Sequence, residues 1–155
     1  DLLDLYARII ELVSRTKSIC ILQHSAEDHS ICQELYEIFE NNPKVNLIDE
    51  DLFSFEIESM ISKMEFLVGS RYHSLIHAYK NNVPVIAIGW ADKYVELLAR
   101  FGQDQYCIDI REGLAIEKME NAIDAMLNNY RVEARTIEAV LEAVSKRFDP
   151  FSTLI

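Results

Sequence analysis

The stretch EFLVGSRYHSLIHAYKNNVPVIAIGWADK, residues 65–93, predicts one strand–helix–strand unit. Residues 66–68 form an apolar run short enough for a buried strand, and a Gly69-Ser70 hinge then leads into a helical pattern. The Asn81-Asn82 pair ends that helix, and residues 83–88 are apolar and β-branched, as in a buried parallel strand. The crossover between two such strands is almost always right-handed.

The same patterns recur along the chain and predict an α/β fold. With 155 residues, the chain fits a single domain, residues 1–155, that has an adequate core. Strands alternating with helices predict a doubly wound, parallel, five-stranded sheet of Rossmann type with strand order 2-1-3-4-5. The expected strands are residues 18–24, 45–48, 66–68, 83–88 and 105–110; the expected helices are residues 1–17, 25–40, 54–64, 70–80, 92–101, 114–129 and 132–148.

Several local signals refine these boundaries. Ser25 and Asp28 have the spacing of a capping box, which opens the second helix. Asp92 is expected to cap the helix that Gly102 ends. Helical spacing predicts that particular side chains face the core: Ile31, Leu35, Ile38 and Phe39 in the second helix, Ile57, Met60 and Ile61 in the third, and Val95, Leu98 and Phe101 before Gly102. Pro150 then releases a short apolar tail, residues 151–155.

The overall composition excludes some classes of partner. A net charge of −11 argues against non-specific binding to nucleic acid or to an anionic membrane, because both need a basic surface. No apolar run approaches a membrane span, and we expect no signal peptide. The three cysteines lack metal-ligand spacing, so we expect idle or buried thiols in a reducing compartment.

Five polar residues converge on one edge of the expected sheet, although they lie far apart in the sequence. In a doubly wound sheet, ligands bind beyond the carboxyl ends of the strands. His24 follows the first strand, Ser70, Arg71 and His73 follow the third, and Lys93 follows the fourth. A helix start near Ser70 adds unpaired N–H groups, and Arg71 adds a planar fork, so the edge suits a small anion that carries phosphate or carboxylate groups.

The residues Gly69-Ser70-Arg71-Tyr72-His73, the later strand VPVIAI and Lys93 together resemble the carboxy-terminal half of the polysaccharide pyruvyltransferase family. The resemblance covers residues 18–110. It implies a pyruvyl transfer from phosphoenolpyruvate to a glycan acceptor, a sugar of a cell-surface polysaccharide or of its lipid-linked precursor. It also implies two Rossmann-like domains that face each other across a cleft, as in GT-B glycosyltransferases.

The resemblance assigns roles to individual residues and to the chain as a whole. Arg71 would hold the donor, with Ser70, His24 and Lys93 beside it, and His73 would be the catalytic acid or base. The chain begins at Asp1 inside a helix, so we expect an excised domain whose amino-terminal partner domain is missing and which is inactive alone. The expected location is the cytoplasm, with peripheral attachment of the longer protein to the inner membrane face left open.

Other interpretations of the same residues remain. Arg71 and His73 could merely cap and solvate a helix, and Lys93 could be an ordinary surface lysine. His73 and His77 have the spacing of a metal pair, but no third ligand is evident, so we expect no metal and no cofactor, and His77 is interpreted as packing. Trp90 could stack on a sugar or belong to the core.

Two other protein classes share this type of sheet. A nucleotide-sugar-binding domain of a GT-B glycosyltransferase is the nearer alternative, but it usually carries acidic residues in the helix that occupies residues 70–82 here, and this chain has none there. A receiver-like signalling domain would need an acidic cluster after the first strand, where this chain has His24-Ser25.

Overall fold

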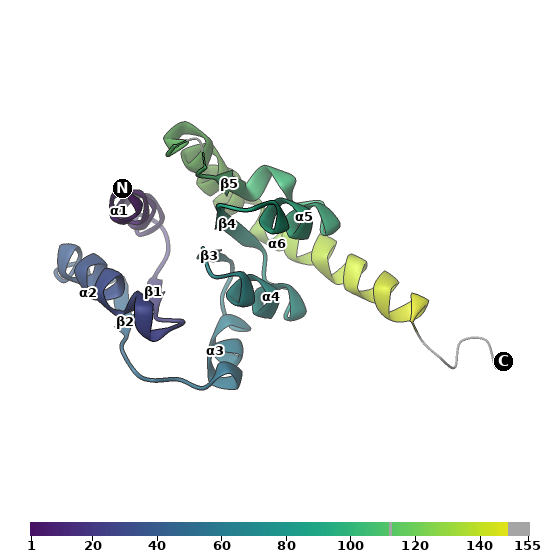
Figure 1. Cartoon of the computed structure of the whole chain (residues 1–155), viewed down its shortest axis with the longest axis horizontal. Helices are drawn as coiled ribbons and strands as arrows, with labels where there is room; N and C mark the ends of the chain where they lie inside the picture. Colours follow the sequence, from purple (N-terminus) through teal and green to yellow (C-terminus); the bar gives the residue numbers. More distant parts are fainter. Residues whose placement is uncertain (112, 149–155) are drawn as a thin grey trace.

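The computed structural model describes residues 1–111 and 113–148. Helices and short parallel strands alternate along the described chain (Figure 1). The helices are α1 (Leu2–Val13), α2 (His29–Ile38), α3 (Ser54–Ile61), α4 (Tyr72–Lys80), α5 (Asp92–Arg100) and α6 (Ile116–Arg147). The strands are β1 (Ile19–Leu22), β2 (Val45–Ile48), β3 (Leu67–Gly69), β4 (Val85–Gly89) and β5 (Cys107–Asp109), with short 3₁₀ turns at Ala26–Asp28 and Asp104–Tyr106.

The five strands form two sheets, so the prediction of one five-stranded sheet is wrong. β1 pairs with β2, and β3–β4–β5 form a second sheet, all in parallel. The predicted neighbours therefore pair, except at the junction of β1 and β3. Helix α1 lies at this junction, because its Ile9 and Val13 belong to the larger core cluster while its Ile10 belongs to the smaller one.

The second sheet holds most of the core. Every residue of β4 is buried, as the apolar sequence of the central strand predicted. Around it pack fully buried aromatic side chains, and Tyr79 stacks on Phe101 with ring centroids 4.0 Å apart. The β1–β2 sheet has a smaller cluster of its own: Ile10, Ile21, Cys32, Leu35 and Val45.

The carboxy-terminal region is one helix, α6, and not the two helices that the sequence predicted. The expected break fell near Asn128 and Asn129, but neither glycine nor proline is present there to stop a helix. Instead the two amide side chains donate to the carbonyls of Asp124 and Ala125, 2.8 and 3.0 Å away, within the helix. Figure 1 shows α6 crossing behind the second sheet and projecting beyond the rest of the molecule.

Other local predictions were partly wrong. Helix α2 buries Cys32 and Leu35 and leaves Ile38 exposed, while Ile31 and Phe39 are half-buried. Helix α3 buries Ile57 and Ile61, and Met60 is half-buried. In α5, Ala91 is the N-cap and Asp92 the first helical residue. The buried face carries Tyr94, Leu97 and Leu98, and Val95 is exposed. The predicted tail at residues 151–155 lies outside the described residues.

Two of the three thiols, which we expected to be buried or idle, are buried, and the third is exposed. Cys32 and Cys107 are buried, whereas Cys20 in β1 is exposed. Burial raises the pKa of the Cys32 thiol to about 11, so that thiol stays protonated and unreactive at neutral pH.

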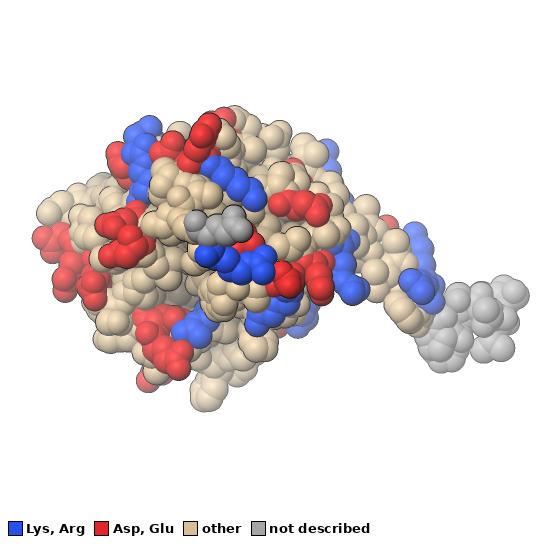
Figure 2. All heavy atoms as spheres, turned by 45° about the horizontal axis from the view of Figure 1, so that its top comes forward, with Lys and Arg blue, Asp and Glu red and all other residues tan. Residues whose placement is uncertain are grey.

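The surface agrees with the acidic composition. Acidic and basic side chains are interspersed over the face seen in Figure 2, and no broad basic area gathers on it. Within the described part of the chain, no helix combines the length and the apolarity needed to cross a membrane.

Candidate functional site

Arg71 sits in the loop between β3 and α4, directly before the first helical turn. It is the N-cap of α4 and has an extended backbone, with φ −85° and ψ 117°. Its carbonyl accepts a hydrogen bond from Ser74 Oγ, 2.6 Å away. Because Arg71 is outside the helix, its side chain is not fixed on the face opposite His73, and both residues can reach toward one ligand.

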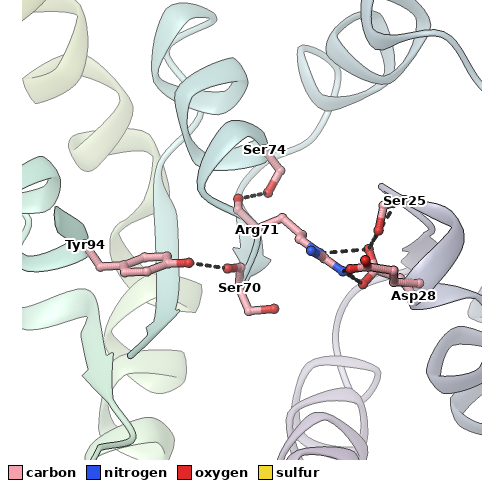
Figure 3. Close-up of polar contacts among 7 residues, drawn as sticks. Ser25, Asp28, Ser70, Arg71, Ser74 and Tyr94 are labelled. Carbon is pink, nitrogen blue, oxygen red and sulfur yellow. Dashed lines mark hydrogen bonds and ion pairs between the residues drawn. The ribbon is translucent and has the colours of Figure 1, made fainter. Parts of the chain in front are cut away.

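The Arg71 guanidinium reaches across to the loop that follows β1 (Figure 3). Its Nη2 lies 2.7 Å from Asp28 Oδ1 and 3.0 Å from Glu27 Oε2, and its Nε lies 3.0 Å from Asp28 Oδ1. These carboxylates raise the pKa of Arg71 above its ordinary range, with Asp28 the larger influence. Carboxylates therefore occupy the fork that we expected to bind the donor.

Asp28 is itself held in place, in the geometry that the capping-box pattern predicted. Its Oδ2 accepts hydrogen bonds from the backbone N–H of Ser25 at 3.1 Å and from Ser25 Oγ at 3.2 Å. The cap opens the 3₁₀ turn Ala26–Asp28, and α2 follows at His29. The local sequence after β1 thus presents a fixed carboxylate to Arg71.

His24, at the end of β1, is half-buried and faces the same region. Its Nε2 is buried without a hydrogen-bond partner among the described residues, and its ring centroid lies 6.3 Å from that of His77. Burial lowers the pKa of His24, and the neighbouring His77 lowers it further, while Asp28 opposes both. Since buried polar atoms are normally paired, this nitrogen is available to a ligand.

His77 has polar partners, and does not simply pack as we had interpreted. Its Nδ1 lies 2.9 Å from Glu58 Oε2, and its Nε2 lies 3.2 Å from Ser54 Oγ. Glu58 also pairs with Lys80 and accepts from Asn81, so the group joins α3 to α4. Both ring nitrogens of His77 are thus used within the fold, and the described residues contain no group of three or more side chains arranged to hold a metal ion.

His73 and Lys93 lie on the exposed part of the edge. His73 is the second residue of α4 and its side chain is exposed. Lys93 is on the first turn of α5, and its Nζ lies 4.9 Å from the centre of the Tyr72 ring, next to the start of α4. The structure thus places all five predicted residues at the carboxyl ends of β1, β3 and β4, although Arg71 alone among them forms an ion pair within the described residues.

Tyr94 supports this edge, and the sequence analysis had not singled it out. Its hydroxyl donates to the Ser70 carbonyl at 2.8 Å (Figure 3). Its ring packs against Gly89 at the end of β4. The side chain is fully buried. The signal was present in the sequence, because Tyr94, Leu97 and Leu98 have the i, i+3, i+4 spacing of one helix face.

A cavity of about 520 Å³ extends from the candidate site between the two sheets. Apolar side chains of α1, β1, α2 and β3 line most of it, and Tyr6 is among them, with a pKa that burial raises to about 12. The polar residues that line it at the candidate site are His24, Asp28, Ser70, Arg71 and Ser74. The gap left by the missing β1–β3 pairing therefore opens directly onto the candidate site.

The arrangement suits an anionic ligand of small size. The guanidinium of Arg71 and the ammonium group of Lys93 balance the carboxylates of Asp28 and Glu27 at this edge, and the N-terminus of α4 adds a partial positive charge that attracts an anion. The half-buried His24 and the exposed His73 add two imidazoles that can donate hydrogen bonds or exchange protons.

Comparison with known proteins identifies the family. No solved structure matches the chain. A family described as polysaccharide pyruvyl transferase matches residues 1–92, a span that includes His24, Asp28, Ser70, Arg71 and His73 and ends just before Lys93. This span is more than half of the chain and contains both loops that meet at Arg71. The chain belongs to the polysaccharide pyruvyl transferase family.

Proposed function

We propose that this chain binds phosphoenolpyruvate and takes part in moving its pyruvyl group to a sugar. The observation that carries the proposal is the position of Arg71 before α4, beside His24 and within the span that matches the family. Phosphoenolpyruvate carries both a phosphate and a carboxylate, so it needs a compact group of cationic and N–H donors. The edge at β1, β3 and β4 supplies such a group.

In the donor complex, Arg71 leaves Asp28 and Glu27 and binds the phosphate or carboxylate through its planar fork. Ser70 and the first N–H groups of α4 contact the same anion. Lys93 adds a point charge from the neighbouring strand end, and His24 Nε2 donates a hydrogen bond from the half-buried side. This assignment gives a partner to the histidine nitrogen that lacks one within the described residues.

His73 supplies the proton that starts the transfer. Protonation of the methylene carbon of phosphoenolpyruvate leaves a cation at the adjacent carbon, to which a sugar hydroxyl adds with loss of its own proton. Phosphate then leaves with the electron pair of its C–O bond, and a second hydroxyl closes the pyruvate ketal. A histidine is suited to donate this proton near neutral pH.

The acceptor is a sugar of a cell-surface polysaccharide or of its lipid-linked precursor, and the reaction takes place in the cytoplasm. The candidate site is an open edge, so we propose that a second Rossmann-like domain faces it, as in a GT-B arrangement, and completes the active site. On its own this chain would then bind the donor and fail to transfer it. Detectable pyruvyl transfer by residues 1–155 alone would contradict this part of the proposal.

A pair of titrations tests the donor assignment. The chain is titrated with phosphoenolpyruvate and, separately, with a nucleotide sugar, and binding is followed by calorimetry and by the phosphorus resonance of the ligand. We expect saturable binding of phosphoenolpyruvate that Arg71→Ala abolishes, and no specific binding of the nucleotide sugar. The opposite preference would assign the site to a glycosyltransferase instead.

The role of His73 is tested in a transferase that contains both domains. His73→Gln keeps a side chain of similar size and hydrogen-bonding capacity, but it cannot donate a proton at neutral pH. We expect transfer to fall by about 10²–10⁴-fold, with a much smaller change in donor affinity. Equal losses in turnover and donor affinity would make His73 a binding residue rather than the acid.

A further inference from the structure

Trp90 follows a strand that is buried along its whole length, yet its own side chain is 48% exposed. It is the sole tryptophan of the chain. Its ring centroid lies 5.1 Å from that of Tyr94, with the planes tilted by 51°. The indole is therefore supported by a fully buried ring while about half of the side chain faces solvent, which excludes the interpretation of Trp90 as a core residue.

The position of this ring relates it to the candidate donor site. Tyr94 contacts Trp90 through its ring and the Ser70 carbonyl through its hydroxyl. Tyr72, at the start of α4, packs edge-on against Tyr94 with centroids 5.7 Å apart. The rings of Tyr72, Tyr94 and Trp90 thus form a row along the carboxyl edge. The row begins beside the donor loop, residues 70–71, and ends at the exposed Trp90.

Polar side chains lie beside the end of β4. Arg111 Nη1 pairs with Asp92 Oδ1 at 2.7 Å, and Arg111 Nη2 pairs with Asp109 Oδ2 at 2.6 Å. Asp92 is two residues after Trp90, and Asp109 is the register partner of Gly89, the residue before Trp90. The two aspartates outweigh the single guanidinium in this group, so its local charge does not favour an anionic ligand.

We propose that Trp90 is the stacking platform for the acceptor, a neutral pyranoside whose hydroxyls bind the Asp92–Arg111 pair. The weakly positive C–H groups of a pyranose face match the negative face of an indole ring. A carboxylate and a guanidinium together accept from and donate to sugar hydroxyls. The proposal rests on the proposed function, because it identifies the ring next to the donor site as the place where the acceptor lies.

The single tryptophan is its own reporter. Its emission and its quenching by acrylamide are measured while neutral methyl pyranosides are added, with a methyl uronoside as the charged control. We expect the neutral sugar to shift the emission and to protect Trp90 from the quencher, and the uronoside to do so less. Equal accessibility of Trp90 with and without every sugar, up to their solubility limits, would overturn the proposal.

Variants separate stacking from a structural effect. Saturation-transfer NMR with the same sugar should show about tenfold weaker binding in Trp90→Ala and a smaller loss in Trp90→Phe, which keeps an aromatic face. Phe53→Ala, which removes an aromatic ring elsewhere that is even more exposed, at 70%, should leave sugar binding unchanged. Sugar binding that survives Trp90→Ala, or that Phe53→Ala weakens equally, contradicts the platform.

Titration with phosphoenolpyruvate distinguishes a failure of this inference from a failure of the proposed function. Trp90→Ala should bind phosphoenolpyruvate as the unmodified chain does, because the ring packs on Tyr94, which is not assigned to the donor. Donor binding without sugar protection overturns the platform and leaves the proposed function intact, whereas the absence of donor binding overturns the proposed function itself. A loss of donor affinity in Trp90→Ala would show that the ring supports the donor loop and is not an acceptor platform.

Discussion

Arg71 and Asp28 connect the two sheets of this molecule, with Nη2 2.7 Å from Oδ1 and Nε 3.0 Å from the same oxygen. One residue follows β3 and the other follows β1, and these two strands do not pair with each other within the described chain. The ion pair therefore bridges the gap at the candidate site. Since both side chains are partly exposed, the pair adds only about 1 kcal/mol to the free energy of unfolding.

The shape of the Arg71 side chain should matter more than its charge. Arg71→Lys should weaken phosphoenolpyruvate binding almost as much as Arg71→Ala, because lysine keeps the charge but loses the planar fork. Isothermal calorimetry on the three proteins measures this directly. If the lysine variant binds the donor like the unmodified chain, Arg71 contributes only general positive potential.

Removing the negative charge of Asp28 should favour the donor. Asp28→Asn leaves a similar side-chain shape but releases the guanidinium from its strongest partner, so donor affinity should rise several-fold. Glu27→Gln is the matched control and should have less effect, because Glu27 is 81% exposed and makes one contact to Arg71. Weaker donor binding in Asp28→Asn would instead make Asp28 a positioning residue for the arginine.

The lowered pKa of His24 predicts a stability that falls in mild acid. Burial and His77 depress the pKa in the folded state, so the unfolded chain takes up this proton first as the pH drops. The free energy of unfolding should therefore decrease as the pH falls below about 6.5, and the decrease should end below the folded-state pKa. Urea denaturation at a series of pH values measures this slope.

The His24→Gln variant should flatten that pH dependence, while His73→Gln, which changes an exposed ring on the same edge, should keep most of it. Arg111 lowers the pKa of Asp109 to about 2, so Asp109 affects stability only in stronger acid. Its titration does not overlap with the pH range in which His24 acts. An unchanged slope in His24→Gln would show that another group titrates.

Gly89 should tolerate no side chain, since a Cβ there would lie 2.7 Å from Tyr94 Cγ and 2.8 Å from Tyr94 Cβ. Gly89→Ala should lower the free energy of unfolding by about 1–3 kcal/mol through overpacking, and should disturb the hydrogen bond that Tyr94 makes to Ser70. Urea denaturation measures the loss, and the fluorescence of neighbouring Trp90 reports the local shift.

Gly102 is the matched control for Gly89. A Cβ at Gly102 meets nothing within 4 Å, but the backbone is left-handed with φ +66°. Gly102→Asn should therefore be cheaper than Gly102→Ala, because asparagine adopts this conformation more readily. At Gly89, the larger asparagine should lower the free energy of unfolding more than alanine does. A smaller loss for Gly89→Asn than for Gly89→Ala would contradict the steric explanation.

Local sequence patterns predicted helices and strands well where apolar residues mark the buried face of the element. The predicted strand at residues 45–48 coincides with β2, and the buried run before Trp90 became the central strand β4. The sequence could not show that β1 and β3 stay unpaired, because no local pattern determines which strand edges meet. Apolar side chains of α1 and the cavity lie between β1 and β3. The positions of these side chains and of the cavity depend on contacts between distant parts of the chain.

The buried face of α5 was predicted wrongly. Tyr94, Leu97 and Leu98 form it and Val95 is exposed, so the helix is rotated about its axis relative to the face that we expected. The wrong face hid the role of Tyr94 at the candidate site. Likewise the polar Asn128 and Asn129 suggested a break in α6, whereas their side chains bond back onto the helix that they were expected to end.

The candidate site was predictable in its location but not in its internal partners. The carboxyl ends of parallel strands lie at the same edge, regardless of which strands are hydrogen-bonded to each other. His24, Arg71 and Lys93 therefore gather at one edge even though the sheet is split. The sequence did not reveal that Arg71 would bind Asp28 and Glu27, because that contact spans 43 residues between Asp28 and Arg71 and depends on the distance between two sheets. His77 was likewise misread, since Glu58 and Ser54 come from another helix.

Because β1 and β3 do not pair, the rate of amide hydrogen exchange should alternate from residue to residue along their unpaired edges. Ile19 donates its N–H to the Lys44 carbonyl and Leu67 donates to the Pro84 carbonyl, so in a parallel ladder the N–H groups of Cys20 and Val68 point the other way. That direction is the cavity, where the described strands offer them no ladder partner. In deuterium exchange, slow and fast amides should therefore alternate along β1, and a ligand that fills the cavity should slow the fast ones first.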